Sequence, residues 1–330
     1  MKIISLFCGC GGMDLGLAKA GHKIVYANDN DKDSIDTYKK YFTKKFKTSS
    51  SHIHLNDIKK EKIKNIPDGD VVVGGFPCQG FSVANTFRKD KRTMERKNND
   101  LYLEMIRIIK GKKPKYFIAE NVPGILSLGG YKDKEAQKKR TGRIFTSILS
   151  DFQKIGYKIQ WQILNAAEFG VPQSRRRVII LGTRKDIKKD LIHPQPTHSI
   201  EDDLFLKKTP NLWNAINDLE KVKLGDDEIL NHEGSKHKVK FNGYIGNRVT
   251  KKDKVSPTIV GRGGGTGGPV IIPHPNGKRR LSVRETARLQ AFPDDMFFCG
   301  SISSGYRQIG NAVAWPVAYA LGKTLKDSLN

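Results

Sequence analysis

Cys78 combines a reactive side chain with a position just after an expected strand. The valines at 71–73 form a continuous β-branched run that predicts a buried strand, and glycine and proline residues at 74–77 end it. Open α/β sheets carry ligands and chemistry at the carboxyl ends of their strands. Cysteine is more often a buried structural residue. However, a cysteine on a loop rich in glycine and proline, followed by a basic stretch, is a candidate thiolate nucleophile.

Glu120 and an arginine cluster are the next groups that could act on a substrate. Glu120 follows an apolar run, and a carboxylate at the end of a buried strand is costly to desolvate, so it is usually paired or protonated. Three consecutive arginines lead into the apolar run 178–181. Strand alternation puts Arg175 and Arg177 on one face and Arg176 on the other. Such clusters are usually solvated edges, but a solvated edge does not explain one that leads into a buried strand.

A glycine-rich turn near the start of the chain predicts a ligand-binding loop. A strand at 3–7 and a helix at 13–20 are expected around it, and a second strand, 23–27, ends close to Asp29. This unit is similar to a nucleotide-binding fingerprint, although the match is inexact and an ordinary tight turn is equally consistent with it. Glycines let the backbone approach a ligand, and the glycines of this turn are Gly9, Gly11 and Gly12.

Carboxylates that follow these strands could bind a nucleoside. Asp29 is best placed to accept hydrogen bonds from both ribose hydroxyls, whereas Asp31 is expected to cap the next helix. Asp57, in a third strand region at 54–58, could accept from an adenine amino group, and a role as a helix N-cap is equally consistent with its spacing. Both S-adenosylmethionine and a dinucleotide satisfy this pattern.

The net charge indicates an anionic partner. Lys plus Arg total 59 against 34 Asp plus Glu, a formal charge of +25 over 330 residues. Nucleic acid is the natural partner for such a surface, although a general lysine bias would explain part of the excess. The four cysteines have no zinc-binding spacing. The apolar runs are too short for a signal peptide or a membrane span, so we expect a cytoplasmic protein without a metal or a membrane partner.

The pattern of elements predicts an α/β fold with two parts. After Arg184 the composition changes, and residues 185–275 are expected to form a separate loop-rich lobe that contains the glycine-dense stretch 256–268. Residues 84–99 are polar and basic, and they are expected to form a loop. The remaining expected elements are strands at 116–119, 158–164 and 178–181, and helices at 101–109, 144–152, 283–290 and 317–325, the last opened by residues 310–313.

Taken in order, these stretches closely resemble the bacterial DNA (cytosine-5)-methyltransferase family of the restriction–modification type, over nearly the whole chain. The resemblance implies an α/β S-adenosylmethionine-dependent methyltransferase (Rossmann-like) sheet with a smaller loop-rich target-recognition lobe. It divides the chain into 1–185 plus 300–330, the catalytic and cofactor-binding domain, and 186–299, the target-recognition domain and hinge. The motifs that carry it are Phe7-Cys8-Gly9-Cys10-Gly11-Gly12, Gly75-Phe76-Pro77-Cys78-Gln79, Glu120-Asn121-Val122, Gln173-Ser174-Arg175-Arg176-Arg177, Arg284-Glu285 with Phe292-Pro293-Asp294, and Gly310-Asn311-Ala312-Val313.

The resemblance implies roles for the candidate residues. Cys78 would add to carbon 6 of cytosine and create an enamine whose carbon 5 attacks the methyl group of S-adenosylmethionine. Glu120 would bind or protonate ring nitrogen 3, and Arg177, together with Arg175, would hold the exocyclic oxygen. The base must first be flipped out of the duplex, and the segment 79–99 resembles the loop that closes on it. Beside the glycines named above, the residues that match the family's cofactor pocket are Phe7, Asp29, Asp57, Pro77, Leu101, Asn311 and Val313.

The chain departs from the family pattern at two cofactor-pocket positions. Asn30 stands where relatives often carry an aromatic residue that stacks on adenine, and Ala312 replaces a common serine. The expected partner is double-stranded DNA. We expect a monomer. A cognate restriction endonuclease acting on the same site is a possible partner, and the sequence leaves open whether one exists.

Two other functions share much of this pattern. A transfer-RNA (cytosine-5) methyltransferase has the same cysteine loop and the same Glu-Asn-Val motif, and a catalytically inactive DNA-binding relative would keep the fold. The large second lobe favours duplex DNA, because reading a duplex sequence requires a groove-reading surface. The intact set of Cys78, Glu120 and Arg177 favours catalysis over an inactive relative.

Overall fold

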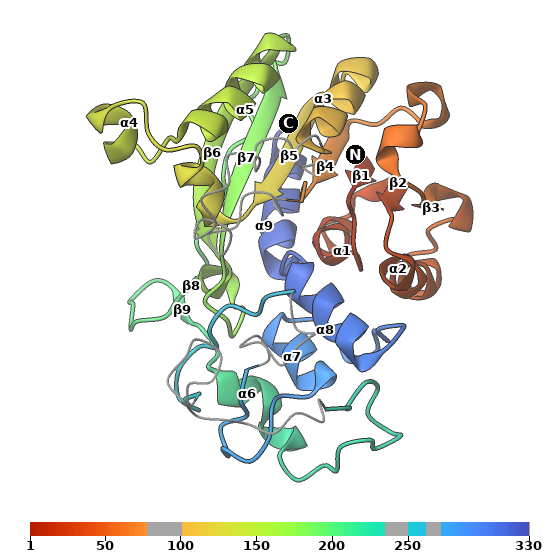
Figure 1. The fold of residues 1–330 in the computed structure, drawn as a ribbon, viewed down its shortest axis with the longest axis vertical. Coiled ribbons are helices and arrows are strands. Elements are labelled where there is room, and N and C mark those ends of the chain that lie inside the picture. The colour runs from red at the N-terminus through yellow and green to blue at the C-terminus, as the bar shows by residue number, and fades with distance from the viewer. Residues whose placement is uncertain (78–100, 235–249, 262–271, 330) are drawn as a thin grey trace.

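A mixed sheet forms the centre of the molecule. The computed structural model describes residues 1–77, 101–234, 250–261 and 272–329. The sheet contains seven strands, which are β1 (Lys2–Leu6), β2 (Lys23–Asp29), β3 (Ile53–Leu55), β4 (Val71–Gly74), β5 (Tyr116–Asn121), β6 (Tyr157–Asn165) and β7 (Arg176–Arg184). Their spatial order is β3-β2-β1-β4-β5-β7-β6. Strands β1 to β5 pair in parallel, and β7 is antiparallel to both of its neighbours (Figure 1).

Helices cover both faces of the sheet, as expected for buried parallel strands. Side chains of α1 (Gly12–Lys19), α2 (Lys32–Lys45) and α9 (Trp315–Asp327) share one apolar core with Val71 and Val73 of β4. Side chains of α3 (Leu101–Lys112) and α5 (Arg143–Lys154) share a second core with Val72. The three valines are fully buried, which confirms the expected buried strand.

The last helix returns to the first. Gly16 of α1 has no room for a side chain, because a Cβ there would lie 2.5 Å from the amide nitrogen of Tyr319 and would overlap the carbonyl of Trp315. This close approach lets α9 pack along α1 although about 300 residues separate them. The start of the chain and its end therefore build one structural unit. Among the described residues, no helix has the length and apolar character needed to cross a membrane.

A second lobe lies below the sheet in Figure 1. Its described elements are β8 (His198–Ser199), β9 (Lys207–Lys208), α6 (Leu212–Ile216), α7 (Val283–Leu289) and α8 (Ile302–Asn311), with long connections between them. The expected loop-rich character of residues 185–275 is confirmed in their described part. Residues 262–268 of the glycine-dense stretch 256–268, and the basic segment 84–99, lie outside the described residues.

Two features near the C-terminus differ from expectation. Residues 302–311 form α8, a helix that the sequence pattern did not indicate, and it packs against α7 in the second lobe. Gly310 and Asn311 end this helix, and residues 312–314 are a connection to α9, so residues 310–313 do not open the last helix. Helix α8 is stabilised by the packing of its buried residues Gly305 and Tyr306, and its many polar residues gave no helical pattern in the sequence. A third difference lies earlier in the chain, where the short helix α4 (Lys134–Lys138) was not expected.

Candidate active site

The candidate residues gather at the point in the sheet where the order of successive strands reverses, between β1 and β4. From β1 the chain moves outward to β2 and β3, whereas β4 pairs with the other side of β1 and leads to β5. The glycine turn after β1 and residues 75–77 after β4 therefore leave neighbouring strands at the same edge. Such a switch point is where doubly wound sheets bind their ligands.

The glycine turn after β1 requires glycine for two reasons. Gly11 has a φ of +92°, and a Cβ there would lie 2.5 Å from the Phe42 ring and 2.8 Å from the Tyr38 ring. Gly9 has a φ of +53°, and no atom of the described chain lies within 4 Å of the place a Cβ would take. The turn is thus packed tightly on its inner side and open beside Gly9.

Asp29 ties this turn to the end of β2. Its Oδ2 accepts from the backbone N–H of Gly9 at 2.8 Å, and its Oδ1 accepts from that of Asp31 at 2.9 Å. Burial raises the pKa of the Asp29 carboxyl, and these backbone hydrogen bonds oppose the rise. Each oxygen keeps a further lone pair for a ligand hydroxyl. Asp31 caps α2 through Ser34, as predicted.

Asp57 follows β3 and lies close to the Asp29 segment. The backbone N–H of Asn56 donates to the carbonyl of Asp29 at 3.1 Å, which joins the ends of the two strands. The Asp57 carboxylate accepts from the backbone N–H of Lys59 at 3.0 Å and caps a short 3₁₀ helix at 58–60. The N-cap alternative is therefore correct for the described residues, and contact with adenine stays a prediction.

The end of α8 and its connection to α9 contribute Asn311 and Val313 to the same edge. A Cβ at Gly12 would overlap the carbonyl oxygen of Val313, so the start of α1 and this connection touch through their backbones. Val313 is buried and the Asn311 side chain is exposed. Predicted pocket residues from three separate stretches of the chain are thus brought together around the end of β1: Gly9 and Gly12, Asp29, and Val313.

The remaining predicted pocket residues are Phe7, Pro77 and Leu101. Phe7 and Leu101 pack against the core on the opposite face of the sheet from Val313, and Pro77 follows β4. Phe7 has a φ of +54°, and its ring lies 3.5 Å from the place a Cβ on Gly74 would take. Phe7 and Leu101 are partly buried against the core that contains Phe76. Pro77, also partly buried, is the last described residue before Cys78, which lies outside the described residues.

Glu120 and Arg177 form an ion pair beside the cysteine loop. Glu120 is the last residue but one of β5 and Arg177 is the second residue of β7, and the distance from Oε1 to Nε is 2.8 Å. The two side chains are 11 % and 13 % exposed. Burial lowers the pKa of Arg177, and the attraction of Glu120 opposes this effect. The other carboxylate oxygen, Oε2, would lie only 2.8 Å from a Cβ on Gly75, so Gly75 leaves the space that Glu120 occupies.

Asn121 binds the backbone of Phe76, two residues before Cys78. This contact was not predicted from the sequence. Its Nδ2 donates to the carbonyl of Phe76 at 3.1 Å, and its Oδ1 accepts from the backbone N–H of Val122 at 2.9 Å. The side chain is buried. The signal was present, because a polar residue next to Glu120 at the end of a buried strand needs a hydrogen-bond partner.

Arg175 has different partners from those expected. The predicted alternation is confirmed, since Arg176 is exposed while Arg175 and Arg177 are buried or largely buried. The guanidinium of Arg175 donates to protein carbonyls, those of Ile259, Gly310 and Ala312, at 2.5 to 2.8 Å. Its Nε has no hydrogen-bond partner among the described residues. The structure therefore brings Arg175 close to the ion pair but occupies both of its terminal nitrogens.

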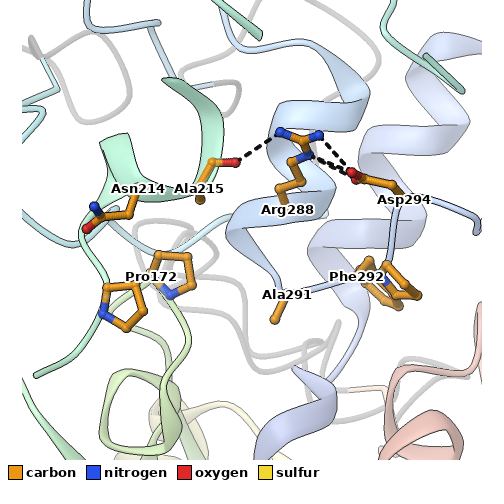
Figure 2. A pocket seen from close by; sticks show the side chains of 9 residues that line it. Pro172, Asn214, Ala215, Arg288, Ala291, Phe292 and Asp294 are labelled. Atoms are coloured by element: carbon orange, nitrogen blue, oxygen red, sulfur yellow. Dashed lines mark hydrogen bonds and ion pairs between the residues drawn. The ribbon is translucent and has the colours of Figure 1, made fainter. Parts of the chain in front are cut away.

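A hollow in the second lobe is separate from these groups. It has a volume of about 360 Å³ and lies between α6 and the end of α7 (Figure 2). Arg288 lines the hollow, and its guanidinium donates to both carboxylate oxygens of Asp294 and to Asp218. None of the predicted site residues lines it. Across the described ranges, no group of three or more His, Cys, Asp or Glu side chains could hold a metal ion.

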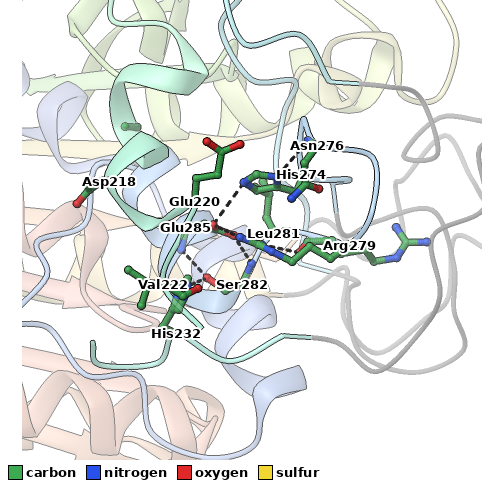
Figure 3. A network of polar contacts seen from close by, with 12 residues as sticks. Asp218, Glu220, Val222, His232, His274, Asn276, Arg279, Leu281, Ser282 and Glu285 are labelled. Carbon is green, nitrogen blue, oxygen red and sulfur yellow. Dashed lines mark hydrogen bonds and ion pairs between the residues drawn. The ribbon is translucent and has the colours of Figure 1, made fainter. Parts of the chain in front are cut away.

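The Arg284-Glu285 motif has a structural role in the second lobe. Figure 3 shows Glu285, fully buried, at the centre of a polar network in which Arg279 donates to both carboxylate oxygens at 2.6 and 2.7 Å. Glu285 and Ser282 form a capping box at the start of α7. Arg284 donates to the carbonyls of Leu230, Pro293 and Met296. The motif thus joins the loops of this lobe to α7.

Comparison with known proteins agrees with this arrangement. The family model for C-5 cytosine-specific DNA methylase matches residues 1–327. The chain belongs to the C-5 cytosine-specific DNA methylase family. Among curated members of this family, the type II methyltransferase M.NgoFVII of Neisseria gonorrhoeae is 36 % identical over 98 % of this chain and 86 % of its own length. M.FnuDI of Fusobacterium nucleatum is 33 % identical over 100 % of this chain and 95 % of its own.

Solved structures show that the fold is shared across this methylase family. The S. pombe Dnmt2 methyltransferase matches with a TM-score of 0.62 at 19 % identity, over 100 % of this chain and 99 % of that one. The Entamoeba histolytica methyltransferase EhMeth matches with a TM-score of 0.64 at 17 % identity, over the same shares. The α/β methyltransferase fold, the enzyme class and the dependence on S-adenosylmethionine, all expected from the sequence, are confirmed.

The described residues fit a bound S-adenosylmethionine. The open space beside Gly9 lies next to Asp29, whose oxygens retain lone pairs for ribose hydroxyls. The start of α1 presents backbone N–H groups without a side-chain cap, since Gly11 is its N-cap. A carboxylate, a glycine turn and an uncapped helix start therefore meet at the switch point of the sheet.

Proposed function

We propose that this methyltransferase acts on carbon 5 of a flipped cytosine within a specific duplex DNA sequence, through a covalent adduct with Cys78. The observation that carries the proposal is the Glu120–Arg177 ion pair directly beside Gly75, three residues before Cys78. A nucleophile, an acid and a guanidinium at the end of adjacent strands are the groups this reaction requires.

Cys78 would begin the reaction. Its thiolate adds to carbon 6 of the cytosine, the electron pair of the 5,6 double bond shifts to form a 4,5 double bond, and the electron pair of the double bond between carbon 4 and nitrogen 3 moves to nitrogen 3, which gives an enamine. When bound, S-adenosylmethionine supplies an electrophilic methyl group to carbon 5 and would leave as S-adenosylhomocysteine. Loss of the carbon 5 proton to a base then expels the thiolate of Cys78 and restores the double bond. Asn121 would keep the cysteine in reach by holding the Phe76 carbonyl.

Glu120 and Arg177 would stabilise the adduct. Negative charge moves toward ring nitrogen 3 and the exocyclic oxygen when the thiolate adds. Glu120 would donate a proton or hydrogen bond at nitrogen 3, and Arg177 would bind the oxygen. Their ion pair holds both groups in one orientation before the base arrives, so little rearrangement is needed.

The DNA would lie between the catalytic sheet and the second lobe. We propose the division into residues 1–185 plus 300–330 for catalysis and 186–299 for target recognition, with α8 packed on the recognition side. The charge of +25 supplies the attraction to phosphates, and the base has to leave the helix to reach Glu120. The cofactor contacts proposed are those predicted above, with Asp57 acting beside its capping role. Similarity to type II methyltransferases supports a restriction–modification role. A cytoplasmic location, a monomeric state and an endonuclease for the same site remain part of the proposal.

Bisulfite sequencing tests this function. Genomic DNA from bacteria that express the protein should carry methylated cytosine at one position of one short sequence, and DNA from bacteria that express Glu120→Gln should carry far less. Purified protein should methylate duplex DNA and leave transfer RNA unmodified. Methylation of transfer RNA alone, or of neither, would contradict the proposal.

A further inference from the structure

Three fully or almost fully buried side chains, Gln173, Arg175 and Gln290, form a cluster that we call the clasp. The two glutamines bind each other, and Arg175 shares the Ala312 carbonyl with Gln290. Gln173 Nε2 donates to Gln290 Oε1 at 2.6 Å and to the carbonyl of Leu289 at 3.1 Å. Gln290 Nε2 donates to the carbonyls of Ile309 and Ala312 at 3.0 and 2.9 Å. The clasp therefore joins the residues before β7 to the ends of α7 and α8.

The clasp also binds the backbone of the second lobe at Ile259. The backbone N–H of Ile259 donates to Gln173 Oε1 at 2.9 Å, and the carbonyl of Ile259 accepts from Arg175 at 2.5 Å. Next to it, the chain at 256 pairs with residues 172 to 174, through Ser174 N–H to Ser256 carbonyl at 2.8 Å and Ser256 N–H to Pro172 carbonyl at 2.9 Å. Both backbone groups of Ile259 are thus fixed to the segment that leads to Arg177.

The same side chains hold the backbone on both sides of Asn311. Arg175 donates to the carbonyls of Gly310 and Ala312, both at 2.8 Å. A Cβ on Gly261 would overlap the side chain of Asn311, so the second-lobe segment lies directly on this residue. Because the Arg175 guanidinium binds both the Ile259 carbonyl and the carbonyls on either side of Asn311, a shift of Ile259 would be transmitted to the Asn311 backbone.

We propose that Gln173, Arg175 and Gln290 are positioning residues that couple DNA binding by the second lobe to cofactor binding at Asn311 and Val313. This inference rests on the proposed function, because it takes the second lobe as the DNA-reading part. DNA that holds residues 256–261 in their clasped position also holds Asn311 in the cofactor pocket. Coupling between two sites in proteins is typically about 5- to 150-fold in affinity, and it is reciprocal.

Isothermal titration with S-adenosylhomocysteine measures this coupling without turnover. The affinity of wild-type protein is measured alone and with a saturating duplex that carries the methylated site, and the duplex should tighten binding at least fivefold. In Gln290→Glu, which replaces two amide N–H donors by a carboxylate oxygen, the tightening should fall below twofold. Gln308→Glu is the matched control, a buried glutamine of α8 outside the clasp, and should keep the wild-type ratio.

Gly261→Ala tests the same coupling without a new charge, should Gln290→Glu fail to fold. Its Cβ would separate the second-lobe segment from Asn311, so the tightening should again fall below twofold. Gly234→Ala, which would meet only the flexible end of Leu224, is its control. At saturating cofactor, kcat of Gly261→Ala should stay within threefold of wild type while KM for S-adenosylmethionine rises.

Two results would overturn the coupling. One is that the duplex does not change the affinity of the wild-type protein for S-adenosylhomocysteine. The other is that the duplex tightens binding by Gln290→Glu and by Gly261→Ala as much as it tightens binding by the wild-type protein. A wild-type protein that binds S-adenosylhomocysteine but neither binds nor methylates duplex DNA would instead contradict the proposed function, and the coupling with it.

Discussion

Glu120 and Arg177 face each other across neighbouring strands, with Oε1 of the carboxylate 2.8 Å from Nε of the guanidinium. The pair lies at the carboxyl edge of the sheet, beside Gly75. A buried ion pair gives uncertain net stability, because the cost of removing two charges from water offsets their attraction. Its position therefore favours a catalytic reason for keeping both charges here.

Glu120→Gln should lower the rate of methylation at least about 100-fold, because the proposed proton donor to ring nitrogen 3 is lost. The affinity for duplex DNA should change less than fivefold, since the side chain is only 11 % exposed. Glu104→Gln provides a matched control, because Glu104 forms a 2.7 Å ion pair with Arg107 on α3. Steady-state methylation of a cognate duplex measures the rates of both variants. A Glu120→Gln rate within threefold of wild type would exclude the proposed role.

Asn121→Ala should slow formation of the covalent adduct while leaving cofactor affinity unchanged. The substitution removes the hydrogen bond to the Phe76 carbonyl and so loosens the backbone that leads to Cys78. A lost buried hydrogen bond costs about 1–3 kcal/mol, and we expect a decrease of about tenfold in the single-turnover rate. Titration with S-adenosylhomocysteine reports the cofactor affinity. If adduct formation keeps its wild-type rate, Asn121 does not position the loop.

Gly12→Ala should weaken S-adenosylmethionine binding by about tenfold or more. Its Cβ would overlap the Val313 carbonyl, which would push the connection between α8 and α9 away from the start of α1. Gly111→Ala is the control, because its Cβ would meet only the flexible Ile63 side chain. Equal cofactor affinities of the two variants, measured by titration, would show that this backbone contact does not shape the pocket.

Asp14 should make stability depend on pH. It is fully buried under the glycine turn, accepts from the hydroxyls of Ser5 and Tyr38 at 2.7 Å, and burial raises its pKa to about 6. The folded state therefore binds the proton more tightly than the unfolded chain, and stability falls as pH rises from about 4 to about 6. The total loss is about 3 kcal/mol, with about 1 kcal/mol of it between pH 5 and 7.

Urea unfolding of wild type and Asp14→Asn at pH 5 and pH 7 measures this dependence. The loss of stability between the two pH values should be about 1 kcal/mol smaller in the variant. Asp68→Asn, at an exposed position, should keep the wild-type difference. An identical pH difference in wild type and Asp14→Asn would show that Asp14 does not titrate as expected.

Periodicity predicted the elements whose burial follows a simple rule. The valines at 71–73 gave a correct expectation, because a continuous β-branched run is typical of a strand buried on both faces. The alternation of Arg175 to Arg177 did so because side chains along an extended segment point to opposite faces in turn. Helix α8 was missed, since small and polar residues such as Ser304, Gly305 and Gln308 share its buried face with Tyr306 and Ile309. The two apolar side chains alone are too few to stand out as a helical pattern in the sequence.

Contacts of single side chains could not be predicted in the same way. The sequence motif placed Arg175 beside Arg177 and suggested a shared role. Its partners are carbonyls 84 to 137 residues away, which only the folded chain brings close. Asp57 shows the opposite case, because a local hydrogen bond to Lys59 was readable as an N-cap from spacing alone.

Covalent capture on a duplex with 5-fluorocytosine at the target position is the most direct test of the central claim. Fluorine at carbon 5 cannot leave as the proton does, so the adduct with the nucleophile persists and survives denaturing electrophoresis. With S-adenosylmethionine present, wild type, Cys8→Ala, Cys10→Ala and Cys299→Ala should form the adduct, and Cys78→Ser should form none while still binding the duplex. A persistent adduct with Cys78→Ser, or its loss in Cys299→Ala, would show that Cys78 is not the nucleophile.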